Sequence, residues 1–379
     1  MKILVTGAHG FIGKNLVRRL KNIGYTDIME FTRENTEDEL KAFCSEADFV
    51  FHLAGVNRPE NDDEFRTGNT DLTKQLSTLL ENSGNKCPVV FSSSTQADRS
   101  DQDNIYAVSK RGAEEALYEY GNKTGAPVVI YRMPNVFGKW SRPDYNSAVA
   151  TFCHNVARNL PIKVNDPEHM MHLVYIDDVV SEFVEDMTII CDGGKVPGSG
   201  EAHTPLRCPV YDAKLGYIAE TIESFPEMRK KLEVPRLIDP LVSKLYSTYL
   251  SFIPENDFAY KLDMKKDVRG SFTEFIRTPD RGQISVNISH PGITKGQHWH
   301  DSKNEKFLVV QGKGLIRFRQ IGGEKITDYH VSGDDLTVVD IPTGYVHCII
   351  NEGDTDMVTI MWASEAYDPE RPDTFAEEI

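Results

Sequence analysis

The strongest constraint on the fold is a change in the apolar pattern about two thirds of the way along the 379-residue chain. Up to about Tyr246, short apolar runs alternate with amphipathic segments, which predicts strands alternating with helices. The expected strands are Lys2–Thr6, Asp27–Phe31, Phe49–Leu53, Pro88–Ser92 and Pro127–Arg132, and the expected helices include Lys14–Asn22, Asp71–Asn82 and Ser109–Asn122. This alternation predicts a doubly wound α/β domain, in which helices cover both faces of a parallel sheet.

After about Lys261 the helical segments stop and short strands follow one another, separated by glycine-containing breaks. The expected strands are Ile284–Ile288, Lys306–Gln311, Gly314–Arg319, Thr337–Ile341 and Met357–Ala363. This pattern is typical of an all-β sandwich or barrel. We therefore expect one domain over residues 1–246, a connector over 247–260 and a second domain over 261–379. The connector is rich in aromatic residues and carries Pro254, so we expect it to pack between the domains.

Charge and composition exclude several classes of function. The chain has 42 Lys and Arg against 58 Asp and Glu, a net charge of −16, which argues against a nucleic-acid partner. No stretch approaches the roughly 18 apolar residues of a membrane span, so we expect no membrane insertion. The chain starts directly with a strand-like run and has no signal-peptide layout. Its six cysteines form no C-x-x-C pair, which favours reduced thiols and a cytoplasmic location.

A glycine-rich turn joins the first expected strand to the first expected helix. Gly7, Gly10 and Gly13 follow the spacing G-x-x-G-x-x-G, which lets backbone amides approach a pyrophosphate at a helix N-terminus. The turn predicts a Rossmann-like dinucleotide site to which Phe11 and Ile12 also belong, although a tight turn without a ligand is the alternative. Arg33 follows the second strand, where it favours the 2′-phosphate of NADPH; a solvated loop arginine is equally compatible with the sequence.

Three polar residues further along the chain indicate ketone reduction. Tyr106 and Lys110 are separated by one helical turn, so their side chains share a helix face. A nearby ammonium is expected to lower the pKa of the tyrosine, which can then give a proton to a carbonyl oxygen as hydride arrives. Ser94 ends a strand-like run, and its hydroxyl can hold that oxygen.

These motifs resemble the extended short-chain dehydrogenase/reductases that act on nucleotide sugars. The matching stretches run in the family's order over about residues 1–184 and are Thr6–Gly13, His52–Gly55, Asn69, the Ser94/Tyr106/Lys110 set, Arg132–Gly138 and Val174–Val179. The resemblance implies that Leu53, Ala54 and Gly55 line the cofactor and that Asn135 contacts the sugar nucleotide. The loop Thr95–Ile105 departs from the family pattern, so Ser93 or Thr95 can replace Ser94 as the catalytic hydroxyl.

The second domain carries a set of metal-binding residue types. His298 and His300 lie two residues apart, Glu305 follows, and His347 comes later. Three imidazoles and one carboxylate suit Zn²⁺, Ni²⁺, Fe²⁺ or Mn²⁺; histidines that are merely packed are the alternative. The spacing from Gly292 to Gly312, with Pro342–Asn351, resembles the cupins and implies a cupin barrel, with zinc as the preferred metal.

The stretch from Asp267 to Glu274 resembles a segment of the deoxysugar-nucleotide 3,5-epimerases. The resemblance implies that Arg269 contacts the nucleotide phosphates, which suits a planar guanidinium. An arginine paired with Asp267 or Glu274 for structural reasons is the alternative.

Taken whole, the chain resembles bifunctional enzymes of capsular polysaccharide synthesis. The resemblance implies that the substrate is a UDP-linked 2-acetamido-2,6-dideoxy-4-hexulose, with inversion at C3 followed by reduction at C4 with NADPH. Because reduction destroys the ketone that makes the C3 proton acidic, epimerisation must come first. The candidate bases for C3 are Lys303, Lys306, Tyr345 and the metal-ligand histidines. We also expect a homodimer. The alternative is a single-function reductase or 4-epimerase whose cupin only binds or dimerises.

Overall fold

A parallel sheet forms the centre of the N-terminal unit in the computed structural model, which describes residues 1–98, 103–199 and 203–379. This unit comprises Met1–Ile222 and Ser247–Ile253. Its sheet has the strand order β2-β1-β3-β4-β5. The strands are β1 (Ile3–Thr6), β2 (Ile28–Phe31), β3 (Phe49–His52), β4 (Val89–Ser94) and β5 (Val128–Met133). All four neighbouring pairs are parallel, as the alternating pattern predicts.

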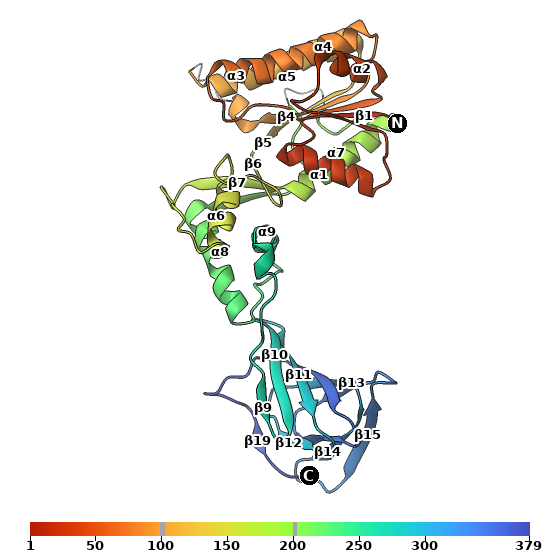
Figure 1. The fold of residues 1–379 in the computed structure, drawn as a ribbon, viewed down its shortest axis with the longest axis vertical. Coiled ribbons are helices and arrows are strands. Elements are labelled where there is room, and N and C mark those ends of the chain that lie inside the picture. Colours follow the sequence, from red (N-terminus) through yellow and green to blue (C-terminus); the bar gives the residue numbers. More distant parts are fainter. Residues whose placement is uncertain (99–102, 200–202) are drawn as a thin grey trace. The chain divides into compact units, whose positions relative to one another are not determined.

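Helices cover both faces of this sheet (Figure 1). On one face lie α2 (Glu37–Glu46), α4 (Leu72–Asn82) and α5 (Ile105–Thr124), and on the other lie α1 (Phe11–Asn22) and α7 (Ile176–Cys191). Successive residues of β1 show why the strands are apolar throughout. Ile3 and Val5 pack into one core cluster, while Leu4 packs into the other, because side chains alternate between the two faces.

Smaller elements complete the N-terminal part of the chain. A short sheet has the order β6-β7-β8 and consists of β6 (Asn135–Phe137), β7 (Met170–Tyr175) and β8 (Val210–Lys214). The other segments are α3 (Asp63–Phe65), the π-helical turn η1 (Arg66–Asp71), the 3₁₀ turn η2 (Thr95–Asp98), α6 (Ala148–Val156), α8 (Leu215–Lys230) and α9 (Pro240–Leu250). The helix α9 therefore includes the first residues of the expected connector, and the 3₁₀ turn η3 (Glu255–Asp257) lies near its end.

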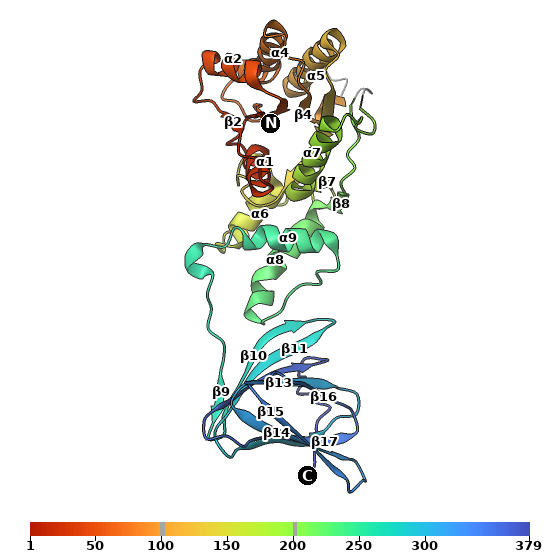
Figure 2. The same ribbon diagram turned by 90° about the vertical axis from the view of Figure 1, so that its right-hand side faces the viewer.

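The second unit comprises Glu223–Tyr246 and Pro254–Ile379, and two antiparallel sheets form most of it (Figure 2). One sheet has the order β16-β13-β18-β11-β10-β9, and the other has the order β15-β14-β17-β12-β19. The strands are β9 (Lys265–Asp267), β10 (Gly270–Thr278), β11 (Gly282–Ser289), β12 (Thr294–Trp299), β13 (Glu305–Gln311), β14 (Lys313–Gln320), β15 (Ile326–Ser332), β16 (Val338–Ile341), β17 (Tyr345–Asn351), β18 (Met357–Ala363) and β19 (Phe375–Ala376). The expected all-β architecture is confirmed, and its form is consistent with a cupin-like domain.

An apolar core between the two sheets includes Phe307, Val309, Ile316, Phe318 and Ile349. Within the described residues, no helix is long and apolar enough to span a membrane. The six cysteines are all free thiols.

Candidate functional sites

The glycine-rich turn is packed so tightly that two of its glycines leave no room for a side chain. Gly7 has φ +66°, and a Cβ atom there would lie 2.7 Å from the Ala54 nitrogen. A Cβ on Gly13 would lie 2.2 Å from the Gly7 oxygen. The helix α1 begins directly after Gly10, so the free backbone N–H groups of its first turn belong to the glycine-rich turn. The sequence therefore folds into a helix N-terminus beside the end of β3, a geometry suited to a pyrophosphate.

A buried hydrogen-bond network fixes the backbone beside this turn. The Thr6 hydroxyl lies 2.7 Å from His52 Nδ1, and it accepts the backbone N–H groups of Leu53 and Ala54, each at 3.2 Å. His52 Nε2 lies 2.8 Å from the hydroxyl of Thr73. Burial lowers the pKa of His52 to about 3, so the ring is neutral. Sequence reasoning gave His52 no such role, since a histidine in a strand carries no sign of its partners.

Ser94, Tyr106 and Lys110 come together at the carboxyl end of β4. The side chains of Ser94 and Tyr106 are hydrogen-bonded, and Lys110 Nζ donates to the Ser92 carbonyl oxygen at 3.2 Å. Burial lowers the pKa of Lys110 to about 8. Burial also raises the pKa of Tyr106, against the smaller lowering effect of its bond with Ser94. The expectation that Lys110 lowers the tyrosine pKa is therefore wrong for this structure, because desolvation is the largest effect.

The structure distinguishes the neighbouring hydroxyls. Ser93 is buried and donates to Glu114 Oε1 at 2.5 Å, so its hydroxyl faces a different partner from that of Ser94. Glu114 in turn accepts two hydrogen bonds from Arg132, at 3.0 and 2.7 Å. Thr95 opens the turn η2, and residues 99–102 of the departing loop lie outside the described residues. Ser94 is thus the hydroxyl that contacts Tyr106, and sequence reasoning missed the Glu114–Arg132 pair.

Asn69 connects the end of β3 to the helix that carries Lys110. It lies in η1, where its Oδ1 accepts the Val56 N–H at 2.9 Å and its Nδ2 donates to Ser109 Oγ at 2.9 Å. A Cβ on Gly55 would lie 2.9 Å from that Oδ1 and 3.1 Å from Lys110 Nζ. Gly55, Asn69 and Lys110 therefore form one tightly packed group.

Two further candidates lie on exposed positions of the N-terminal unit. Arg33 is exposed in the turn after β2, the strand next to β1. Glu30, within β2, is ion-paired with Lys21 at 2.7 Å. Asn135 is exposed on β6 and donates to the His172 carbonyl oxygen at 3.3 Å. Both candidates are accessible to a ligand, and neither is tied into the core.

The four predicted metal ligands converge in the second unit. One ligand atom from each of His298, His300, Glu305 and His347 lies within 4.8 Å of every other. Glu305 Oε2 is 3.4 Å from His300 Nε2 and 3.5 Å from His347 Nε2. His298 in β12, His300 directly after it and His347 in β17 thus meet a carboxylate from β13. Residues up to 49 positions apart form one cluster because the two sheets face each other.

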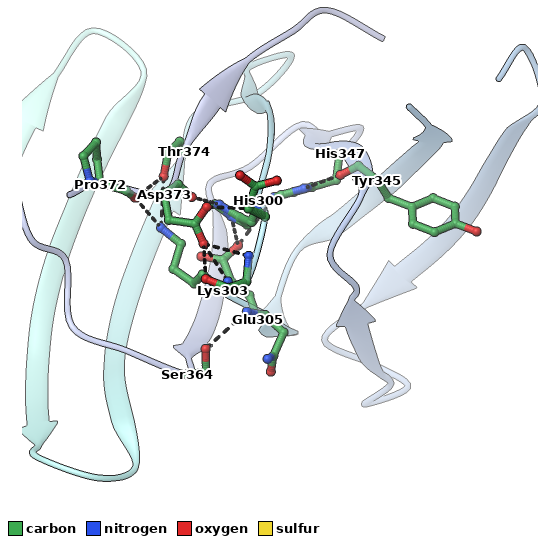
Figure 3. Close-up of polar contacts among 12 residues, drawn as sticks. His300, Lys303, Glu305, Tyr345, His347, Ser364, Pro372, Asp373 and Thr374 are labelled. Carbon is green, nitrogen blue, oxygen red and sulfur yellow. Dashed lines mark hydrogen bonds and ion pairs between the residues drawn. The ribbon is translucent and has the colours of Figure 1, made fainter. Parts of the chain in front are cut away.

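The hydrogen bonding of this cluster fits a metal. His300 Nδ1 lies 2.5 Å from the Asp373 carbonyl oxygen, and His347 Nδ1 lies 3.3 Å from that of Tyr345 (Figure 3). The Nε2 atoms of both rings are buried without a hydrogen-bond partner. Burial, with His347 and His300 nearby, lowers the pKa of His298 to about 4, so this imidazole is neutral, the form that binds metals. Carbonyl oxygens on Nδ1 and unpartnered Nε2 atoms are the arrangement that a metal ligand needs.

The other candidates of this unit are engaged in separate contacts. Arg269 is exposed and donates to Asp267 at 2.6 Å, the structural pairing that the sequence left open. Lys306 is ion-paired with Asp340. Lys303 is buried and donates to the Pro372 oxygen at 3.1 Å, and Figure 3 shows the Tyr345 ring turned away from the metal-binding cluster.

Comparisons with known proteins agree with this division. Residues 3–185 match the NAD dependent epimerase/dehydratase family, and residues 265–375 match the polysaccharide biosynthesis C-terminal domain. The chain is 45% identical over 376 residues to the UDP-2-acetamido-2,6-beta-L-arabino-hexul-4-ose reductase of Pseudomonas aeruginosa, across 99% of this chain and 98% of that one. This chain belongs to the family of that reductase.

Two other comparisons place the family in context. The crystal structure of capsular polysaccharide assembling protein CapF from Staphylococcus aureus is 47% identical, covers 100% of both chains and has a TM-score of 0.90. A probable UDP-glucuronate 4-epimerase of Rhizobium meliloti is 23% identical over 231 residues, which are 48% of this chain and 67% of that one. Family membership confirms an oxidoreductase with a nicotinamide cofactor, among the sugar-modifying enzymes of capsular polysaccharide synthesis.

Proposed function

We propose that this protein is a bifunctional enzyme that epimerises C3 of a UDP-2-acetamido-2,6-dideoxy-4-hexulose and then reduces its C4 ketone with NADPH. The observation that carries the proposal is the presence on one chain of two separate sites. One is the Ser94/Tyr106/Lys110 set beside a dinucleotide turn, and the other is the partly buried cluster of three histidines and one glutamate. The full-length similarity to a reductase of a UDP-linked hexulose supports the substrate class.

The order of the two steps follows from the chemistry of the substrate. A proton on C3 is acidic only while C4 is a ketone, because the enolate spreads its charge onto the carbonyl oxygen. Reduction at C4 removes this stabilisation. Epimerisation therefore precedes reduction, and the reduction makes the inversion irreversible.

The N-terminal residues have distinct roles in the reduction. The glycine-rich turn would hold NADPH, with Arg33 as the contact for its 2′-phosphate, and the bound cofactor would supply the hydride. The Tyr106 phenol gives its proton to the C4 oxygen as the alkoxide forms. Ser94, already hydrogen-bonded to that phenol, holds the same oxygen. Lys110 Nζ packs against Gly55, on the segment expected to line the cofactor, so we assign this ammonium a contact with the cofactor.

The second unit would carry the epimerisation. His298, His300, Glu305 and His347 would hold one divalent metal, which we propose to be zinc, and this ion would polarise a carbonyl oxygen as a Lewis acid. The three imidazoles and the partly buried carboxylate of Glu305 provide the donor set for it. A phosphate contact by Arg269 requires its exposed guanidinium to leave or share Asp267.

Isotope exchange tests the two steps separately. The UDP-4-keto sugar is incubated with the protein in D₂O, and the C3 signal is followed by NMR without and with NADPH. We expect deuterium at C3 without reductant and a reduced, inverted product with it. Reduction without any C3 exchange would contradict the bifunctional proposal and favour a single-function reductase. Conversion at C4 without consumption of NADPH would favour a 4-epimerase, the activity of the probable UDP-glucuronate 4-epimerase that the N-terminal part resembles.

Metal-site variants assign the first step to its unit. We expect His347→Ala to abolish C3 exchange while the chain still reduces a substrate that already has the inverted C3. Retained exchange in this variant would show that the cluster does not catalyse the epimerisation.

We further propose that the protein is a homodimer and that it is cytoplasmic, the latter in keeping with the six free thiols. Sedimentation at micromolar concentration tests the first point, and cell fractionation tests the second.

A further inference from the structure

The C-terminal segment Pro372–Ile379, which we call the strap, runs beside the residues that carry two of the proposed metal ligands. Its short strand β19 pairs with β12, with Ala376 opposite His298 and Phe375 opposite Trp299. The rings of Phe375 and Trp299 are stacked, with their centroids 4.5 Å apart. The strap is therefore paired directly with the strand that carries His298.

One carboxylate fastens the start of the strap to the loop after His300. Asp373 Oδ1 accepts the Asp301 N–H at 2.8 Å, and Oδ2 accepts the N–H groups of Ser302 and Lys303 at 3.0 and 2.7 Å. The Ser302 hydroxyl also donates to Oδ2, at 3.0 Å. Three consecutive backbone donors thus converge on a single side chain.

The same residue holds a proposed metal ligand through its main chain. The Asp373 carbonyl oxygen lies 2.5 Å from His300 Nδ1 (Figure 3). This contact requires the proton of the ring on Nδ1 and leaves the Nε2 lone pair facing Glu305. Asp373 has φ +36°, an uncommon conformation for a residue with a side chain, and its carboxylate bonds hold it there.

The far end of the strap meets a second uncommon conformation. Gln297 has φ +65° and lies at the bulge directly before His298. Its carbonyl oxygen accepts the Glu377 N–H at 3.1 Å, and its Oε1 accepts the Ile379 N–H at 2.9 Å. The strap is therefore hydrogen-bonded to the chain on both sides of His298 and His300: to Gln297 before them and to residues 301–303 after them.

We propose that Asp373 is a positioning residue for the metal site, and that the strap orients His298 and His300 for metal binding. The inference rests on the metal site of the proposed function, but it assigns a role to a segment outside the four ligands. Residues that hydrogen-bond the ligands of a metal typically change its affinity about 10- to 100-fold when they are replaced. Little of the strap is buried: Phe375 is 42% exposed, so the strap contributes little to the apolar core.

The experiment measures zinc affinity in the full-length chain. Protein freed of metal with a chelator is titrated with zinc against a competing zinc-binding dye. We expect Asp373→Ala to bind zinc about 10- to 100-fold more weakly than the wild type. Asp373→Asn tolerates positive φ and keeps one acceptor oxygen, but its NH2 group replaces the other, so we expect a smaller loss of affinity than in Asp373→Ala. Asp368→Ala is the matched control, because Asp368 caps a nearby turn by accepting the Glu370 N–H at 2.9 Å.

Two outcomes are separable from each other. A wild-type chain that takes up no zinc refutes the metal site itself. A wild type that binds zinc, with an equally tight Asp373→Ala variant, refutes only the role of the strap. The melting temperature of the metal-free proteins shows whether a variant is folded. If Asp373→Ala does not fold, a chain ending at Arg371 replaces it, and wild-type affinity in that chain overturns the inference.

Discussion

Replacement of Gly55 by alanine tests whether the packing around Lys110 controls the reduction. The Gly55 backbone accepts a side chain without strain, since its φ is not in the left-handed region. The new Cβ would lie 2.9 Å from Asn69 Oδ1 and 3.1 Å from Lys110 Nζ. Ordinary contact begins near 3.4 Å, so Asn69 Oδ1 must give way by about 0.5 Å and Lys110 Nζ by about 0.3 Å, unless the Gly55 backbone shifts.

Asn69 is the less able of the two to move. It is buried and makes three hydrogen bonds, two with the backbone of Val56 and one with Ser109. Weakening of one or two of these bonds should reduce the free energy of unfolding by about 1–2 kcal/mol. Displacement of Lys110 should lower kcat about 10- to 100-fold, because small misplacements of catalytic groups have effects of that size.

The assay follows NADPH absorbance at saturating cofactor and keto sugar, with urea unfolding of the same samples. Gly121→Ala is the matched control. Gly121 lies in the same helix as Lys110 but away from the site, and its new Cβ would be similarly crowded, at 3.0 Å from Val128 Cγ2. We expect wild-type kcat in this control. A Gly55→Ala chain with wild-type kcat at saturation would refute the idea that this packing sets the position of Lys110.

Three further predictions concern the reductase site. Tyr106→Phe should lower kcat about 10²- to 10⁴-fold with little change in the Kd for NADPH, and steady-state kinetics at wild-type rate would contradict its role as proton donor. Arg33→Ala should weaken NADPH binding about 10- to 100-fold and leave NADH binding unchanged, as measured by fluorescence titration. Equal effects on the binding of both cofactors would refute the proposed contact with the 2′-phosphate. Lys110 has its pKa lowered by burial to about 8 from 10.5, so the folded chain binds fewer protons than the unfolded chain between these values. The free energy of unfolding of the wild type should therefore rise with pH over this window by about 1–3 kcal/mol relative to that of Lys110→Met. Urea midpoints that change equally in the two proteins between pH 7.5 and 10 would disprove this prediction.

The metal-binding cluster shows how far spacing alone can reach. The sequence predicts His298, His300, Glu305 and His347 as ligands, and the structure brings all four together. The sequence does not predict the hydrogen-bond partners of the Nδ1 atoms of these histidines, since Asp373 is 73 residues from His300 and follows no motif. The same holds for Glu114, which bonds Ser93 and Arg132 only because α5 packs beside β4 and β5.

Local sequence determined the features that depend on neighbours along the chain. The glycine spacing specifies a turn that only glycine can occupy, and the alternation of apolar residues specifies strands with two buried faces. The tertiary structure alone decided the protonation of the site. Whether Lys110 lowers the pKa of Tyr106 depends on how deeply the phenol is buried, and here desolvation raises it. Burial is a property of the assembled fold, so no spacing along the chain encodes it.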